Sequence, residues 1–100
     1  MGLFDFFGSG KKMKITDIFP MEDIEKITSV IGPKVAAGSY SQMAQLLGKG
    51  LMDYLKNPSK EISFSRLQGV VKILESFKGF EPSLQGIMEA AIERFNALSK

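Results

Sequence analysis

The sequence predicts an all-α fold, a compact bundle of three to four amphipathic helices with room for a minor two-stranded ribbon. Apolar residues recur at helical spacing along most of the chain, and glycine or proline separates the periodic stretches. The 100 residues are 44% hydrophobic and 24% charged, a composition typical of one globular domain with one core. We therefore divide the chain into an apolar leader with a Gly/Ser linker, residues 1–12, and a single helical domain, residues 13–100.

The domain opens with a short segment that alternates apolar and polar side chains. Residues 13–16 fit a short strand or an extended lead-in, and residues 60–64 form a second extended piece of the same kind. The two pieces could pair as a two-stranded ribbon, which is marginal on its own and needs helices packed against it.

The first helix is predicted over residues 20–31. Pro20 suits the first turn, where its missing N–H is not needed, and Glu22 and Asp23 lie at the positive end of the helix dipole. The dipeptide Gly32-Pro33 predicts the end of this helix. Its buried face consists of Ile24, Ile27 and Ile31.

The second helix is predicted from a capping box of Ser39 and Gln42 and ends before Asn57-Pro58. Gly48 and Gly50 lie inside it, and either the helix breaks at Gly48 or Gly50 lets another backbone come close. We favour the second alternative, because the apolar periodicity continues without a break. The predicted core face consists of Tyr40, Met43, Ala44, Leu47, Leu51, Tyr54 and Leu55, with both tyrosines at the edge of the core.

Two further helices follow the second extended piece. A capping box of Ser65 and Gln68 opens the third helix, which Gly79 closes, and Pro82 opens the fourth. Both helices carry a glycine near their start, Gly69 and Gly86, which predicts a close approach between them. The predicted faces are Leu67, Val70, Val71, Leu74 and Phe77 for the third helix and Leu84, Ile87, Met88, Ala91, Phe95 and Leu98 for the fourth.

The residue types narrow the chemistry that the chain can perform. Histidine and cysteine are both absent, which removes the commonest general base, the commonest metal ligand and thiol catalysis. Glu89 and Glu93 are spaced to share one helix face, but they lie away from the apolar stripe and are predicted to face solvent. The segment Gly8–Lys12 lacks the spacing of a phosphate-binding loop. We expect no enzyme activity, no metal and no cofactor.

The charge distribution argues against a nucleic-acid partner. The formal net charge is +2, from 13 basic and 11 acidic side chains. Lys11, Lys12 and Lys14 against Asp5 account for all of that excess, so the rest of the domain is neutral. A nucleic-acid-binding domain usually carries a basic stripe, and the sequence predicts none.

The leader is the most distinctive stretch, because four large apolar side chains crowd into five positions before Gly8. It could fold back over its own domain, insert into a groove on another protein or a second copy, or dip into a membrane interface. In the last case Lys11, Lys12 and Lys14 would contact anionic headgroups. The candidate partner-binding residues are Leu3, Phe4, Phe6 and Phe7.

These observations favour a small cytoplasmic protein that acts by association rather than catalysis. The leading expectation is a non-enzymatic interaction module, such as an adaptor, an inhibitor or immunity-type partner, or an assembly component, which binds another protein or itself. The alternative is a peripheral membrane protein that uses the Phe-rich leader and the lysines that follow it. No apolar run approaches the roughly 20 residues that a membrane-spanning helix needs.

Overall fold

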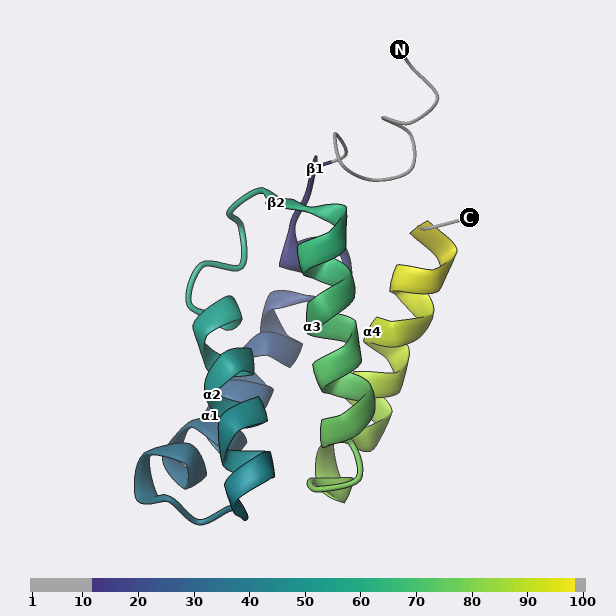
Figure 1. Ribbon diagram of the computed structural model, residues 1–100. Helices are drawn as coiled ribbons and strands as arrows, with labels where there is room; N and C mark the ends of the chain where they lie inside the picture. The colour runs from purple at the N-terminus through teal and green to yellow at the C-terminus, as the bar shows by residue number, and fades with distance from the viewer. Residues whose placement is uncertain (1–11, 99–100) are drawn as a thin grey trace.

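The computed structural model describes residues 12–98, and in that range it confirms a mainly α-helical bundle with a minor ribbon (Figure 1). Four α-helices account for most of these residues, and two short 3₁₀ turns and two two-residue strands complete the described fold. In chain order the elements are β1 (Lys12–Met13), η2 (Ile15–Asp17), α1 (Met21–Ala37), α2 (Gln42–Leu55), β2 (Ile62–Ser63), α3 (Phe64–Phe77), η3 (Pro82–Leu84) and α4 (Gln85–Leu98).

The helices run alternately up and down, so that α1 packs on α2, α2 on α3, and α3 on α4 (Figure 1). The ribbon and the α2–β2 connection lie at one end of the bundle, and the α1–α2 and α3–α4 connections lie at the other. The core between the helices is aliphatic and aromatic. Its largest fully buried side chains are Phe19, Phe77, Ile15, Ile18, Ile27, Ile31, Leu51, Leu67, Leu74, Leu84, Met88 and Val70.

The predicted ribbon is present, although it is shorter than the two extended pieces that suggested it. Lys12 pairs with Ser63 and Met13 with Ile62 in antiparallel register. The chain then turns into η2, and the Thr16 amide donates to the Pro58 carbonyl oxygen at 3.1 Å. This hydrogen bond ties the start of the domain to the α2–β2 connection.

Helix α1 is longer than predicted, and the predicted stop at Gly32-Pro33 is wrong. The helix continues through the exposed Pro33 to Ala37. Gly32 has no Cβ, which relieves part of the clash that proline imposes on the residue before it. The helix ends instead at Gly38, whose φ of 67° lies in the left-handed region. The amides of Gly38 and Ser39 satisfy the last carbonyl groups, those of Val35 and Lys34.

The helix starts that the capping boxes indicate are nearly correct, but the capping residues are different. Ser39 belongs to the turn that ends α1, and α2 begins after Ser41, whose side chain makes no capping hydrogen bond. Helix α3 begins after Ser63, and the Ser63 hydroxyl accepts from the Arg66 amide at 3.2 Å. In both cases the true cap is a serine two positions from the predicted one.

The glycines play different roles from those predicted. Helix α2 is unbroken, as expected, but the tight contact is at Gly48, where a Cβ would lie 2.8 Å from Val35 Cγ2. At Gly50 the nearest atom is a side-chain carbon of Ile73 at an ordinary 3.6 Å. Nothing would lie within 4 Å of a Cβ at Gly69 or Gly86, so the predicted close approach of α3 and α4 through these glycines is wrong.

The predicted core faces are largely correct, with exceptions at their edges. Met43 is 68% exposed and Leu98 is 40% exposed, so neither belongs to the core. In contrast, Ile18 and Phe19 are completely buried, although no periodicity assigned them to the core. They lie between η2 and α1, where the chain is irregular and a helical pattern cannot identify buried positions.

Candidate functional site

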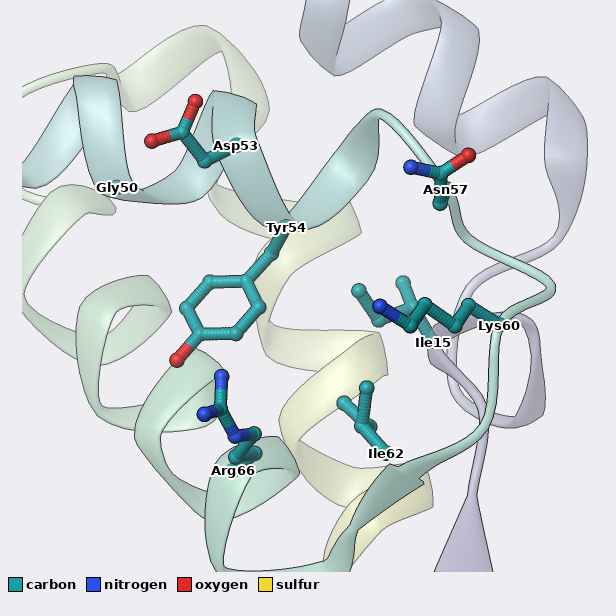
Figure 2. A pocket seen from close by; sticks show the side chains of 8 residues that line it. All are labelled: Ile15, Gly50, Asp53, Tyr54, Asn57, Lys60, Ile62 and Arg66. Atoms are coloured by element: carbon teal, nitrogen blue, oxygen red, sulfur yellow. The ribbon is translucent and has the colours of Figure 1, made fainter.

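An open cavity of about 370 Å³ lies between α2, α3 and the loop that joins them, at the end of the bundle that carries the ribbon (Figures 1 and 2). We call it the α2–α3 pocket. The residues that line it are Ile15, Gly50, Asp53, Tyr54, Asn57, Lys60, Ile62 and Arg66.

The floor of the pocket is apolar and is held in place by the ribbon. Ile15 comes from η2 and is 2% exposed, while the half-buried Ile62 comes from β2. Pairing of Met13 with Ile62 fixes β2 beside the start of the domain, so the two isoleucines line the same pocket although 46 residues separate them. The ring of Tyr54 on α2 lines another side of the pocket, and Gly50, one turn earlier on the same helix, adds no side chain to it.

The rim of the pocket is polar and mainly positive. The Tyr54 hydroxyl on α2 points toward the Arg66 guanidinium on α3 (Figure 2). Asp53 forms an ion pair with Lys56 at 3.4 Å. Among residues 12–98, neither Lys60 nor Arg66 takes part in an ion pair, and both side chains are exposed. The pocket therefore offers an apolar floor next to two cations that a bound anionic group could neutralise.

A second polar cluster lies at the opposite end of the bundle and joins the two helical hairpins. Glu81, only 8% exposed at its side chain, accepts from Lys34 Nζ at 2.9 Å on Oε1 and from the Tyr40 hydroxyl at 2.8 Å on Oε2. Tyr40 also packs edge-on against Phe77, with ring centroids 5.2 Å apart. Tyr40 thus lies at the edge of the core, as predicted, and its hydroxyl donates to Glu81.

The pKa values of Glu81 and Tyr40 shift in opposite directions in this cluster. Burial raises the pKa of Glu81, but hydrogen bonds from Lys34 and Tyr40 and the positive charge on Lys34 outweigh it, so the pKa lies below its ordinary value. Burial and the hydrogen bond to Glu81 raise the pKa of the Tyr40 phenol well above its ordinary value. Both Glu81 oxygens accept hydrogen bonds from within the fold, which indicates a structural role.

Glu89 and Glu93, which were both predicted to face solvent, differ in their surroundings. Glu93 is exposed, while Glu89 is half-buried and lies 3.5 Å from Lys78. A hydrogen bond from Gln85, followed by the Lys78 charge, lowers the pKa of Glu89 below its ordinary value. Within residues 12–98, the acidic side chains form no group of three that could hold a metal ion.

The leader residues singled out in the sequence, Leu3, Phe4, Phe6, Phe7 and Lys11, lie outside the described residues. Lys12 is exposed in β1, and Lys14 is exposed immediately before η2. Both lysines lie beside the ribbon end of the bundle and outside the α2–α3 pocket.

Sequence reasoning missed the α2–α3 pocket itself. Its residues come from four separate elements and one loop, and only their tertiary arrangement gathers Ile15, Lys60 and Arg66 in one place. The single signal within the sequence was Gly50, which interrupts an apolar helix face at the pocket wall.

Comparison of the chain with known protein families, with curated proteins and with solved structures finds no match. Between residues 12 and 98, none of the helices is both long enough and apolar enough to cross a membrane. The geometry of the α2–α3 pocket is therefore the main guide to function.

Proposed function

We propose that the protein is a non-enzymatic interaction module that binds a short protein segment in the α2–α3 pocket. The observation that supports this proposal is the combination of an apolar floor, Ile15 and Ile62, with two rim cations, Lys60 and Arg66, that make no ion pair within residues 12–98. The segment it fits carries a large apolar side chain next to a carboxylate. The lack of cysteine is compatible with the reducing cytoplasm, where we propose the protein acts.

The size and chemistry of the pocket suit such a segment. A cavity of about 370 Å³ is at the small end of the range typical of ligand pockets. An aromatic ring placed on the isoleucines would bury apolar area beside the Tyr54 ring, and the Arg66 guanidinium could stack on its face. A neighbouring carboxylate could accept a bidentate pair of hydrogen bonds from Arg66, with Lys60 adding a second positive charge.

The binding experiment uses a displayed library of short random peptides and the full chain. Arg66→Glu reverses the charge on the pocket rim. Lys72→Glu makes the same change at an exposed site on α3 outside the pocket and is the matched control. We expect selection of peptides with an aromatic residue next to an acidic one, bound about tenfold or more weakly by Arg66→Glu and unchanged by Lys72→Glu. Peptides that bind Arg66→Glu and the unmodified chain equally would refute the proposed site.

Association with an anionic membrane surface is a second candidate, favoured by the exposure of Lys12 and Lys14 directly after the leader. Each basic residue near such a surface contributes about 1 kcal/mol. Flotation with phosphatidylserine-containing vesicles tests it, and the double variant Lys12→Glu, Lys14→Glu should lose binding. Binding that is the same for neutral phosphatidylcholine vesicles would contradict this electrostatic mechanism.

A further inference from the structure

We infer that the leader of the same chain occupies the α2–α3 pocket, with an aromatic side chain on the isoleucine floor and Asp5 facing Arg66 and Lys60. The inference rests on the proposed function, because it takes the same pocket as a binding site, and it names the segment that fills it. An external partner would then have to displace the leader.

The first argument is where the chain enters the fold. The leader joins the domain at Lys12, which pairs with Ser63, and the neighbouring pair is Met13 with Ile62. Ile62 is itself a floor residue of the pocket. The leader therefore joins the ribbon at the residue pair next to Met13 and Ile62, and Ile62 lines the pocket that the leader would fill.

The second argument is the length of chain available. Four residues separate Phe7 from Lys12, and the five steps between them span up to about 17 Å when extended. The segment includes Gly8, Ser9 and Gly10, and glycine adopts the backbone conformations that a sharp turn requires. A tether this short gives its end an effective concentration of the order of millimolar. Weak contacts in the pocket are then sufficient to keep it occupied.

The third argument is chemical complementarity. The leader presents Phe4 and Phe6 on either side of Asp5, its one acidic residue. The pocket presents apolar side chains beside Lys60 and Arg66, which lack ion-pair partners among the described residues. The aromatic–acidic–aromatic order of the leader thus matches the segment that the pocket geometry favours.

A tryptophan reporter tests the inference directly, because the chain contains no tryptophan of its own. In the variant Phe6→Trp, fluorescence reports whether position 6 lies in an apolar environment. We expect the emission maximum to lie at a shorter wavelength than in urea, with protection from acrylamide quenching. Both properties should be independent of protein concentration. Adding Arg66→Glu should move the emission toward that of the unfolded chain, while adding Lys72→Glu should leave it unchanged.

Three results would overturn the inference. Emission equal to that in urea, in a protein whose circular dichroism shows it to be folded, would show that position 6 stays in water. A shift to shorter wavelength that grows with protein concentration would assign the leader to a second copy. A protected tryptophan that does not respond to Arg66→Glu would place the leader elsewhere on the domain.

Failure of the inference and failure of the proposed function give different results. The double variant Phe6→Ser, Phe7→Ser removes the leader's aromatic anchors while keeping the full chain. If this variant binds selected peptides more tightly than the unmodified chain, both ideas are supported. If the tryptophan is buried but no peptide binds either chain, the leader occupies the pocket and the proposed function is wrong. If peptides bind both chains equally and the tryptophan is exposed, the proposed function stands and the inference is wrong.

Discussion

Replacing Gly48 by alanine should destabilise the bundle, although alanine is the better helix former. Gly48 is buried on α2, and a methyl group there would lie 2.8 Å from Val35 Cγ2 and 3.4 Å from Phe77 Cε2. Real carbon atoms do not approach as closely as the first distance. A change of the Val35 rotamer is energetically unfavourable, because a β-branched side chain in a helix has one strongly preferred rotamer. Either Val35 leaves that rotamer or α1 and α2 move apart.

The magnitude follows from two opposing contributions. Inserting a methyl group into a packed site costs about 1–3 kcal/mol, whereas glycine to alanine inside a helix gains about 0.8–1 kcal/mol. Gly48→Ala should therefore lower the free energy of unfolding by about 0–2 kcal/mol. Gly69→Ala is the matched control, since nothing would lie within 4 Å of its methyl group. It should raise the free energy of unfolding by about 0.8–1 kcal/mol.

Urea unfolding followed by circular dichroism measures both variants. The same helix propensity gain applies to each, so the difference between them, about 1–3 kcal/mol, reports the cost of the clash alone. Val35→Ala removes the obstructing methyl group. In the Val35→Ala background, Gly48→Ala should therefore lose most of its clash energy. A Gly48→Ala protein as stable as Gly69→Ala would refute the reasoning.

Further outcomes concern the cluster around Glu81 and the end of α1. Tyr40→Phe removes a donor from a buried carboxylate and should cost about 1.5–3 kcal/mol by urea unfolding. Because the folded-state pKa of Glu81 is lowered, the carboxylate stabilises the fold at pH values above its ordinary pKa, and this stability is lost as pH falls through the folded-state pKa. Lys34→Met should therefore flatten the acid side of a plot of unfolding free energy against pH. The raised pKa of Tyr40 has the opposite sign: the stability it confers is complete below its ordinary pKa of 10.0 and declines at higher pH, a decline that Tyr40→Phe should remove. Gly38→Ala, at a φ of 67°, should lower stability by about 1–2 kcal/mol, and a neutral result would contradict the left-handed helix end.

Features that depend on local periodicity were predictable from the sequence. The buried faces of α3 and α4 follow the 3.6-residue repeat, and Leu67, Leu74 and Met88 are buried as expected. For the ribbon, the sequence offered only short alternating stretches at residues 13–16 and 60–64 and left open whether they form strands; the pairs that form are Lys12 with Ser63 and Met13 with Ile62. Local signals sufficed for the two helices because each one buries a face that its own sequence defines.

Features that depend on tertiary contacts were not predictable in the same way. Pro33 reads as a helix stop, yet packing of Ile31 and Val35 on either side keeps α1 helical across it. Glu81 reads as an ordinary loop acid, and only the fold brings Lys34 and Tyr40 to it from more than 40 positions away. The α2–α3 pocket belongs to the same category, since Ile15 and Arg66 come from distant parts of the sequence.

Main-chain pairing stabilises one end of the bundle, whereas side-chain hydrogen bonds to a carboxylate stabilise the other. At one end, main-chain hydrogen bonds join β1 to β2 beside the α2–α3 pocket, and protonation does not alter them. At the other, the fastening is a charged carboxylate, which acid can neutralise. Acidification should therefore loosen the turns around Tyr40 and Glu81 first, so that amide exchange accelerates there while Met13 and Ile62 remain protected. The acid-sensitive end would therefore loosen while the ribbon end, which carries the α2–α3 pocket, stays folded.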